Sequence, residues 1–154
     1  MPSSDEPAPD GRRQAAADLF NQAWELIELQ DRSPEQDRRM LITACASWLA
    51  WDAIGTDENR AVVDWQIGHI ASLLGYGKLA IAHASAAFER VESAGLPLWM
   101  RASALEGLAR AHAAAGHRAE RDAYAERAAA ALDDISDTED RDLIASQLAT
   151  VPEV

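Results

Sequence analysis

The chain is poor in cysteine and lysine, and each shortage narrows the classes of function open to it. Cys45 is the single cysteine, so no internal disulfide can form and nothing points to an oxidising compartment. Lys78 is the only lysine among 14 basic residues, against 26 acidic ones, and the net charge is −12. Nucleic acids and anionic membranes both require a positive face, so we expect neither as a partner. A basic protein or peptide partner is compatible with this charge.

Long apolar stretches are also missing. No segment approaches the roughly 20 apolar residues that a membrane-spanning helix needs. Residues 1–11 are polar and contain Pro2, Pro7 and Pro9, so we expect a disordered tail there and no secretion signal. A cytoplasmic protein is therefore expected. The preference for arginine over lysine, with abundant alanine, is typical of GC-rich genomes and favours a bacterial source.

Residue types that carry chemistry occur without the partners they would need. The four histidines form no pair at i+3 or i+4, and Cys45 has no ligand nearby, so we expect no metal ion. The acidic segment 133–142 lacks the spacing of a calcium loop. No serine lies in a Gly-x-Ser-x-Gly turn. We therefore expect no catalytic residues, no cofactor and no enzymatic activity.

What the chain does contain is a regular series of glycines. Gly55, Gly75, Gly95 and Gly116 follow one another at nearly equal intervals, each long enough for one helix and a short loop. Glycine adopts the left-handed conformation that ends many helices, and no segment between these glycines alternates with the period of a strand. Short loops should make consecutive helices antiparallel. Seven helices are predicted, over residues 12–30, 34–54, 57–74, 78–94, 97–115, 117–135 and 138–149.

Capping residues support two of these boundaries. Ser33 and Gln36 can form a capping box around Pro34, a residue that suits the first helical position. Ser136 and Glu139 make a second capping box before the last predicted helix.

The glycines also mark a 41-residue repeat, whose length is the interval from Gly75 to Gly116. Shifting the chain by that interval places Trp24 on Trp65 and aligns apolar positions on one helix face. Among the aligned sets are Leu26, Ile67 and Leu108, and also Ala50, Val91 and Leu132.

These helix pairs, with small residues at fixed positions, resemble tetratricopeptide repeat (TPR) proteins with extended helices. Arg121 stands where that family usually has alanine, and a degenerate first copy over 14–54 has Pro34 in place of the turn glycine. A plain helical bundle or another α-solenoid is the alternative architecture. The matching small residues are Gly68, Gly75, Ala80 and Ala87 in one copy and Ala109, Gly116 and Ala128 in the next.

The resemblance implies an all-α domain over residues 12–150, built as a short right-handed α-solenoid. Its antiparallel hairpins would span about 12–54, 57–94 and 97–135, and a helix over 138–149 would cap the last one with Leu143, Ile144 and Leu148. The first helix of each hairpin would line a concave face, where partners of this family bind as extended or helical peptides.

On this concave face we expect a partner-binding groove around Trp24 and Trp65, since aromatic side chains often anchor bound peptides. Glu106 is their equivalent in the third copy. The alternative is that both tryptophans fill the alanine-rich core and that the polar residues form an ordinary solvated face. The candidate partner-binding residues are Trp24, Glu25, Glu28, Trp65, Gln66, His69, Ser72, Ser103, Glu106 and Arg110.

Three functions remain open at this stage. The first is a non-catalytic interaction module that binds a protein or peptide segment, with some positive charge, in the groove. The second is a sensor that holds a small molecule or short peptide between hairpins. The third is a self-associating structural unit, in which an exposed pair of Trp48 and Trp51 would form a homodimer; the alternative for this pair is burial in the core.

Overall fold

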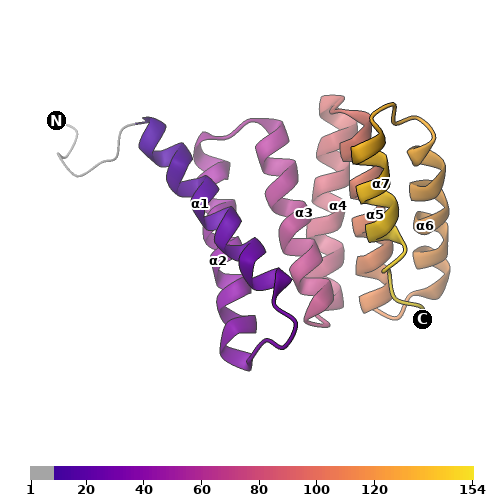
Figure 1. Ribbon diagram of the computed structural model, residues 1–154, viewed down its shortest axis with the longest axis horizontal. Helices are drawn as coiled ribbons and strands as arrows, with labels where there is room; N and C mark the ends of the chain where they lie inside the picture. The colour runs from indigo at the N-terminus through magenta and orange to yellow at the C-terminus, as the bar shows by residue number, and fades with distance from the viewer. Residues whose placement is uncertain (1–8) are drawn as a thin grey trace.

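Residues 9–154, the part of the chain that the computed structural model describes, fold into α-helices without a strand among them (Figure 1). The predicted all-α class is confirmed. The disordered tail predicted for residues 1–11 falls mostly outside the described residues. The helices are α1 Pro9–Glu28, α2 Pro34–Ile54, α3 Asp57–Leu73, α4 Gly77–Ala94, α5 Leu98–Ala114, α6 Arg118–Leu132 and α7 Thr138–Leu148.

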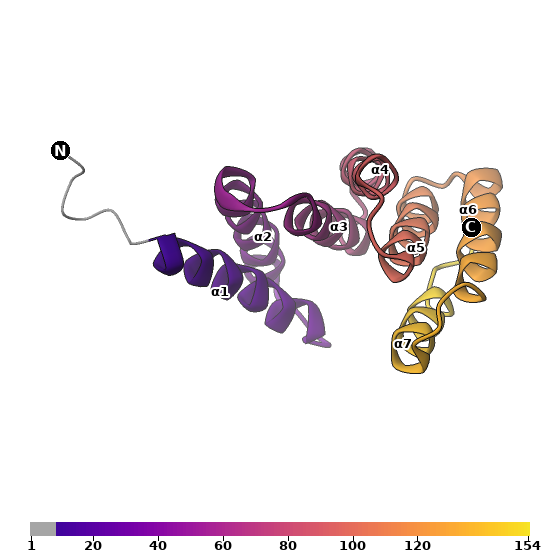
Figure 2. The ribbon, with the colours of Figure 1, turned by 90° about the horizontal axis from the view of Figure 1, so that it is seen from above.

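Each helix packs against the next one in the chain, and two further contacts give the array its curvature. Helix α3 also packs on α5, and α5 on α7, so that every second helix forms a row. Seen from above, α1 and α7 stand forward at the two ends of this row, while α3 and α5 are set back between them (Figure 2). The result is a solenoid-like arrangement with one hollowed face.

The spacing of the helices follows the interval from Gly75 to Gly116. Helix α3 spans 57–73 and α5 spans 98–114, so both ends are displaced by one repeat. The second helices of these hairpins begin at Gly77 and Arg118, which are displaced by the same interval. Successive hairpins therefore present equivalent sequence positions to the same face.

Three of the four evenly spaced glycines end helices as predicted. Gly75, Gly95 and Gly116 have φ values of +78°, +60° and +76°, in the left-handed region. After Gly75, the Tyr76 N–H donates to the oxygen of Ala71 at 2.8 Å, which is the Schellman pattern. The same bond follows the other two glycines.

Gly55 ends α2 for a different reason. Its φ of −84° and ψ of 173° are extended, so the left-handed conformation predicted from its spacing is wrong at this position. A Cβ here would lie 2.6 Å from the Trp51 oxygen and 2.9 Å from the Asn59 Cβ. Lack of room for a Cβ, between the last turn of α2 and Asn59 of α3, requires glycine here, rather than backbone conformation.

The capping box of Ser33 and Gln36 is present at the start of α2, with both reciprocal bonds formed. The box predicted at Ser136 is wrong: Asp137 caps α7 by accepting from the Asp140 N–H at 3.0 Å. Helix α1 starts at Pro9, ahead of the predicted boundary, because proline suits the first position and Asp10 favours the positive end.

Helix α6 ends at Leu132, earlier than predicted. Residues 133–135 follow it in a turn, with i→i−3 bonds from each of their N–H groups. Asp133 and Asp134 oppose helix continuation, since a helix C-terminus disfavours negative charge.

Trp48 and Trp51 belong to the packing between α2 and its neighbours, so the pair is not exposed and the alternative of packing in the core is the one observed. Trp51 is 9% exposed and packs with Val63. The Trp48 Nε1–H donates to Asp64 Oδ1 at 2.8 Å, and the same oxygen lies 2.8 Å from His83 Nδ1. One buried carboxylate on α3 thereby joins α2 and α4.

Candidate functional site

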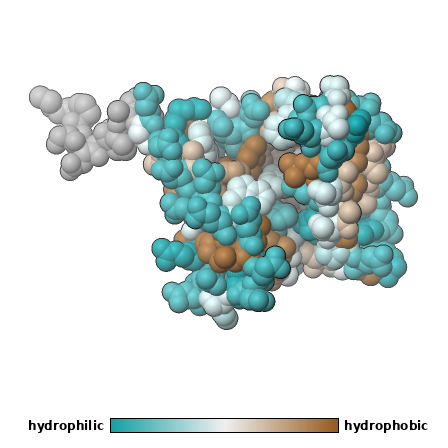
Figure 3. All heavy atoms as spheres, in the orientation of Figure 1, coloured by the Kyte–Doolittle hydropathy of each residue, from teal (hydrophilic) through white to brown (hydrophobic). Residues whose placement is uncertain are grey.

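The hollowed face contains a groove lined by α1, α3, α5 and α7, with Ala87 and Val91 of α4 contributing as well. It encloses about 200 Å³. Trp24 of α1 lies at one side, Trp65 of α3 and Ser103 of α5 line the middle, and Leu143 of α7 lies at the other side. The space-filling view shows this hollow at the centre of the molecule, between the parts formed by α1 and α7 (Figure 3).

Aromatic rings in contact with one another form the part of the groove between α1 and α3. The rings of Trp24 and Trp65 have centroids 5.7 Å apart at an angle of 47°. His69, one turn beyond Trp65 on α3, stacks on that indole at 5.4 Å and 25°. A Cβ at Gly107 would lie 3.2 Å from the Trp65 Cδ1, so this glycine lets the indole rest against the backbone of α5. The Trp65 indole is therefore held in place by His69 of its own helix, α3, and by the backbone of α5.

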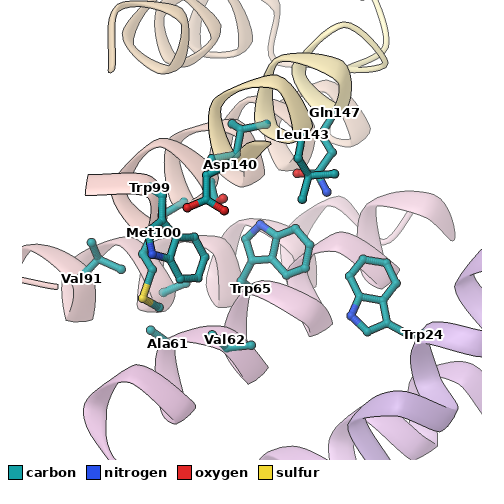
Figure 4. A pocket seen from close by; sticks show the side chains of 14 residues that line it. Trp24, Ala61, Val62, Trp65, Val91, Trp99, Met100, Asp140, Leu143 and Gln147 are labelled. Carbon is teal, nitrogen blue, oxygen red and sulfur yellow. The ribbon is translucent and has the colours of Figure 1, made fainter. Parts of the chain in front are cut away.

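Helix α7 supplies the opposite wall (Figure 4). Leu143 is 58% exposed and lines the groove, so its predicted role in covering the end of the domain is wrong. Ile144, 2% exposed, does pack into the core, since adjacent residues of a helix face different directions. The Asp140 carboxylate also lines the groove and lies near the Trp99 ring in this view.

Behind the groove, Glu106 and Arg110 form a buried ion pair on α5. The Arg110 Nη2 and Nε donate to Glu106 Oε1 at 2.6 and 2.8 Å. The same Nη2 donates to the oxygen of Gln147 and to the Thr150 Oγ1, both at 2.9 Å. Burial raises the pKa of Glu106, and the neighbouring guanidinium opposes part of that rise. The pair fixes α7 in position over α5.

Several buried polar atoms near these rings have no hydrogen-bond partner within residues 9–154. They are Trp65 Nε1, His69 Nδ1, Gln66 Oε1 and Glu106 Oε2. Burial lowers the pKa of His69 to about 4, with Arg110 and Arg32 adding to the effect, so the imidazole is neutral at pH 7. A neutral ring beside two indoles keeps this part of the groove uncharged.

The structure divides the predicted partner-binding residues into three sets. Trp24, Trp65 and Ser103 line the groove, and His69 supports it by stacking. Glu25 and Glu28 are on α1 outside the lining. Ser72 donates to the Gly68 oxygen at 2.8 Å within α3.

The remaining three predicted residues are buried instead of forming a polar lining. Gln66 is 0% exposed and its Nε2 donates to the oxygen of Phe20 on α1 at 3.0 Å. Glu106 and Arg110 are 0% and 6% exposed, in the ion pair under α7. Packing of α1 and α7 over α3 and α5 removes these side chains from solvent.

Sequence reasoning missed the wall from α7, although the repeat contains it. The shift that relates Gly75 to Gly116 also carries Glu106 onto Gln147 and connects Val62, Ser103 and Ile144. The last three residues and Gln147 all line the groove. Extending the repeat to a fourth partial copy would have assigned α7 to the row of first helices.

No family model matches this chain, and no curated protein matches it. None of the helices within residues 9–154 is long and apolar enough to cross a membrane. Over the same residues, no three His, Cys, Asp or Glu side chains are placed to hold a metal ion.

Proposed function

We propose that this chain is a TPR-like interaction module, without catalytic activity, that binds a basic and partly apolar segment of another protein between α1 and α7. The observation that carries the proposal is the aromatic groove of Trp24, Trp65 and Trp99. Apolar side chains of a partner would enter it, since aromatic pockets commonly provide the strongest contacts of an interface. The single cysteine and the acidic charge suit a cytoplasmic module with a basic partner.

The size of the groove favours a protein segment over a small-molecule ligand. Pockets for drug-sized ligands usually enclose about 300–1,000 Å³, whereas a cavity of about 150 Å³ admits benzene. A volume of about 200 Å³ therefore suits one or two side chains of a partner. The rest of such a segment would lie along the open face.

The acidic residues in and near the groove indicate that the bound segment carries a basic residue. Asp140 is the acidic residue in the groove lining, and Glu28 is one helical turn beyond Trp24 on α1. A lysine or arginine of the partner would pair with Asp140 while contacting the face of Trp65, a combination of ionic and cation–π attraction. The ligand expected is thus an apolar anchor followed by a basic residue.

A displayed library of random peptides tests this function directly. Selection on the wild-type chain should enrich peptides that combine aromatic or aliphatic residues with lysine or arginine. Their affinity should fall at least tenfold for Asp140→Lys and Leu143→Arg, because both changes place positive charge in the groove. Arg118→Ala, at an exposed position on α6, serves as the matched control that retains binding.

Two results would contradict the proposal. One is enrichment of peptides that bind both groove variants as tightly as the wild type. The other is the absence of any enriched peptide together with a large, saturable thermal shift caused by a metabolite, which would favour the sensor function.

A further inference from the structure

A second surface, on α2, is separate from the groove and carries exposed apolar residues. Ile42 and Leu49 are 60% and 66% exposed, and the thiol-bearing Cys45 between them is also exposed. Arg38 precedes this group and Asp52 follows it, both exposed. We call these five residues the α2 stripe.

The spacing of the stripe is that of a helix-pairing seam. Its residues follow one another at intervals of 4, 3, 4 and 3, the pattern that keeps side chains on one line along a helix. The buried residues of α2, among them Met40, Ala44 and Trp51, lie on another side of the helix. Packing within the chain therefore leaves the stripe free.

The α2 stripe of one copy matches the α2 stripe of a second copy that runs in the opposite direction. Cys45 lies at its midpoint, equally far along the chain from Arg38 and from Asp52. In an antiparallel pair of such helices, Ile42 of one copy would meet Leu49 of the other, and Arg38 would meet Asp52. Asp52 has a half-exposed carboxylate, 3.7 Å from Arg60, that can accept a second cation.

We propose that α2 is a homodimer interface, in which it pairs antiparallel with α2 of a second copy about a two-fold axis near Cys45. A parallel pair would place Arg38 on Arg38 and Asp52 on Asp52, so charge favours the antiparallel orientation. Antiparallel helix dipoles add to the preference. A two-fold interface of this kind uses the same patch on both subunits.

Helix geometry sets what such a dimer should look like. Packed helix axes are about 8–10 Å apart and Cα atoms lie about 2.3 Å from the axis, so facing Cα atoms would be roughly 3.5–5.5 Å apart. That range overlaps the separation found in disulfides, so Cys45 of both copies can be cross-linked. One helix pair buries less than a standard interface of about 1,600 Å², so affinity should be micromolar or weaker.

The dimer would also matter for the proposed groove, although it does not depend on it. The groove lies between α1 and α7, and none of the five stripe residues lines it. Both grooves of a dimer therefore stay open. A partner carrying two binding segments would gain avidity from their proximity.

Sedimentation equilibrium over micromolar to millimolar chain concentrations tests the interface. We expect a reversible monomer–dimer equilibrium whose dissociation constant rises about tenfold or more in Leu49→Arg, which removes the apolar contact with Ile42 of the other copy and places a charge in the apolar part of the seam. Ile42→Arg should act in the same way. Both residues are exposed, so the thermal unfolding midpoint of the monomer should not change.

Charge exchange tests orientation. Arg38→Asp alone should weaken the dimer, and Arg38→Asp combined with Asp52→Arg should restore it, as only an antiparallel pair predicts. Mild oxidation should cross-link wild-type chains through Cys45, whereas Cys45→Ser with Ala130→Cys, which has its thiol exposed on α6, should not cross-link. A monomer at millimolar concentration, or a dimer that Leu49→Arg leaves intact, would overturn the proposal.

Discussion

Arg110 on α5 holds the main-chain oxygen of Gln147 on α7, with the Nη2 donating at 2.9 Å. The same nitrogen also donates to Glu106, the buried carboxylate next to Gly107, on which the Trp65 indole rests. One guanidinium therefore connects the aromatic side of the groove with its opposite wall. Disturbing it should affect stability and binding together.

Arg110→Ala should lower the free energy of unfolding by about 3–5 kcal/mol, because it leaves the Glu106 carboxylate buried without its counter-ion. Urea denaturation measures the change. Arg118→Ala, at an exposed site, should change stability by less than about 0.5 kcal/mol. A double variant with Gln at both Glu106 and Arg110 should lose less than the two single variants combined, since the pair is coupled.

Stability should depend on the protonation of His69. The pKa of this residue is about 4 in the folded chain, against an ordinary value of 6.5. Between these two values the unfolded chain takes up a proton that the folded chain does not, so stability should fall as pH decreases from 6.5 to 4. The shift corresponds to a loss on the order of 3 kcal/mol at most.

The control for this pH dependence is His69→Gln. Glu106, with its raised pKa, acts in the opposite sense, so the informative quantity is the difference in unfolding free energy between wild type and variant at each pH. The wild type should lose stability relative to this variant as the pH falls. An NMR titration showing His69 protonated near its ordinary pKa of 6.5 would contradict the prediction.

Gly55 and Gly75 should respond differently to substitution. Gly75→Ala should cost about 1–2 kcal/mol for its positive φ, and Gly75→Asn should recover part of that loss, because asparagine tolerates the left-handed region. Gly55→Ala and Gly55→Asn should both destabilise, since any Cβ meets the Trp51 oxygen. If asparagine recovered stability equally at both positions in thermal denaturation, Gly55 too would be required for its backbone conformation.

Gly107→Ala should affect the groove more than the fold. The new methyl group would approach the Trp65 Cδ1 at 3.2 Å and displace the half-buried indole toward the groove, while alanine gains helix propensity of about 1 kcal/mol. Stability should therefore stay within about 1 kcal/mol of wild type. Affinity for groove-selected peptides should nevertheless fall, as fluorescence anisotropy would measure; unchanged affinity would place Trp65 outside the binding surface.

Local chemistry explains what the sequence could predict. The capping box at Ser33, the stop at Gly75 and the equivalence of Trp24 and Trp65 all depend on residues within a few turns or on a constant repeat. The structure contains the capping box and the left-handed stop, and it brings the rings of Trp24 and Trp65 into contact. Gly55 shows the limit of spacing alone, because its neighbour Trp51 determines its role through a contact that the interval does not encode.

The burial of Glu106 could not be predicted from the sequence, because it depends on contacts with residues far along the chain. Glu106 occupies a helix position equivalent to Trp24, so it was expected to line the groove. Its burial follows from Arg110 and from α7, which closes over α5 by bonds between residues 37 and 40 positions apart. The exposure of Leu143 has the same origin, since the adjacent Leu143 and Ile144 are both apolar and only packing against α5 and α6 determines which of them is buried.

The three Schellman turns end their helices with nearly the same backbone geometry, and the helix ends of α3 and α5 differ by one full repeat. Duplication of one such repeat, beginning after Gly95, would therefore return the chain to the same direction and the same helix face. A single residue inserted within a helix would instead rotate the following face by about 100°. Lineages of this fold should accordingly lengthen by whole hairpins, and the groove would grow with them.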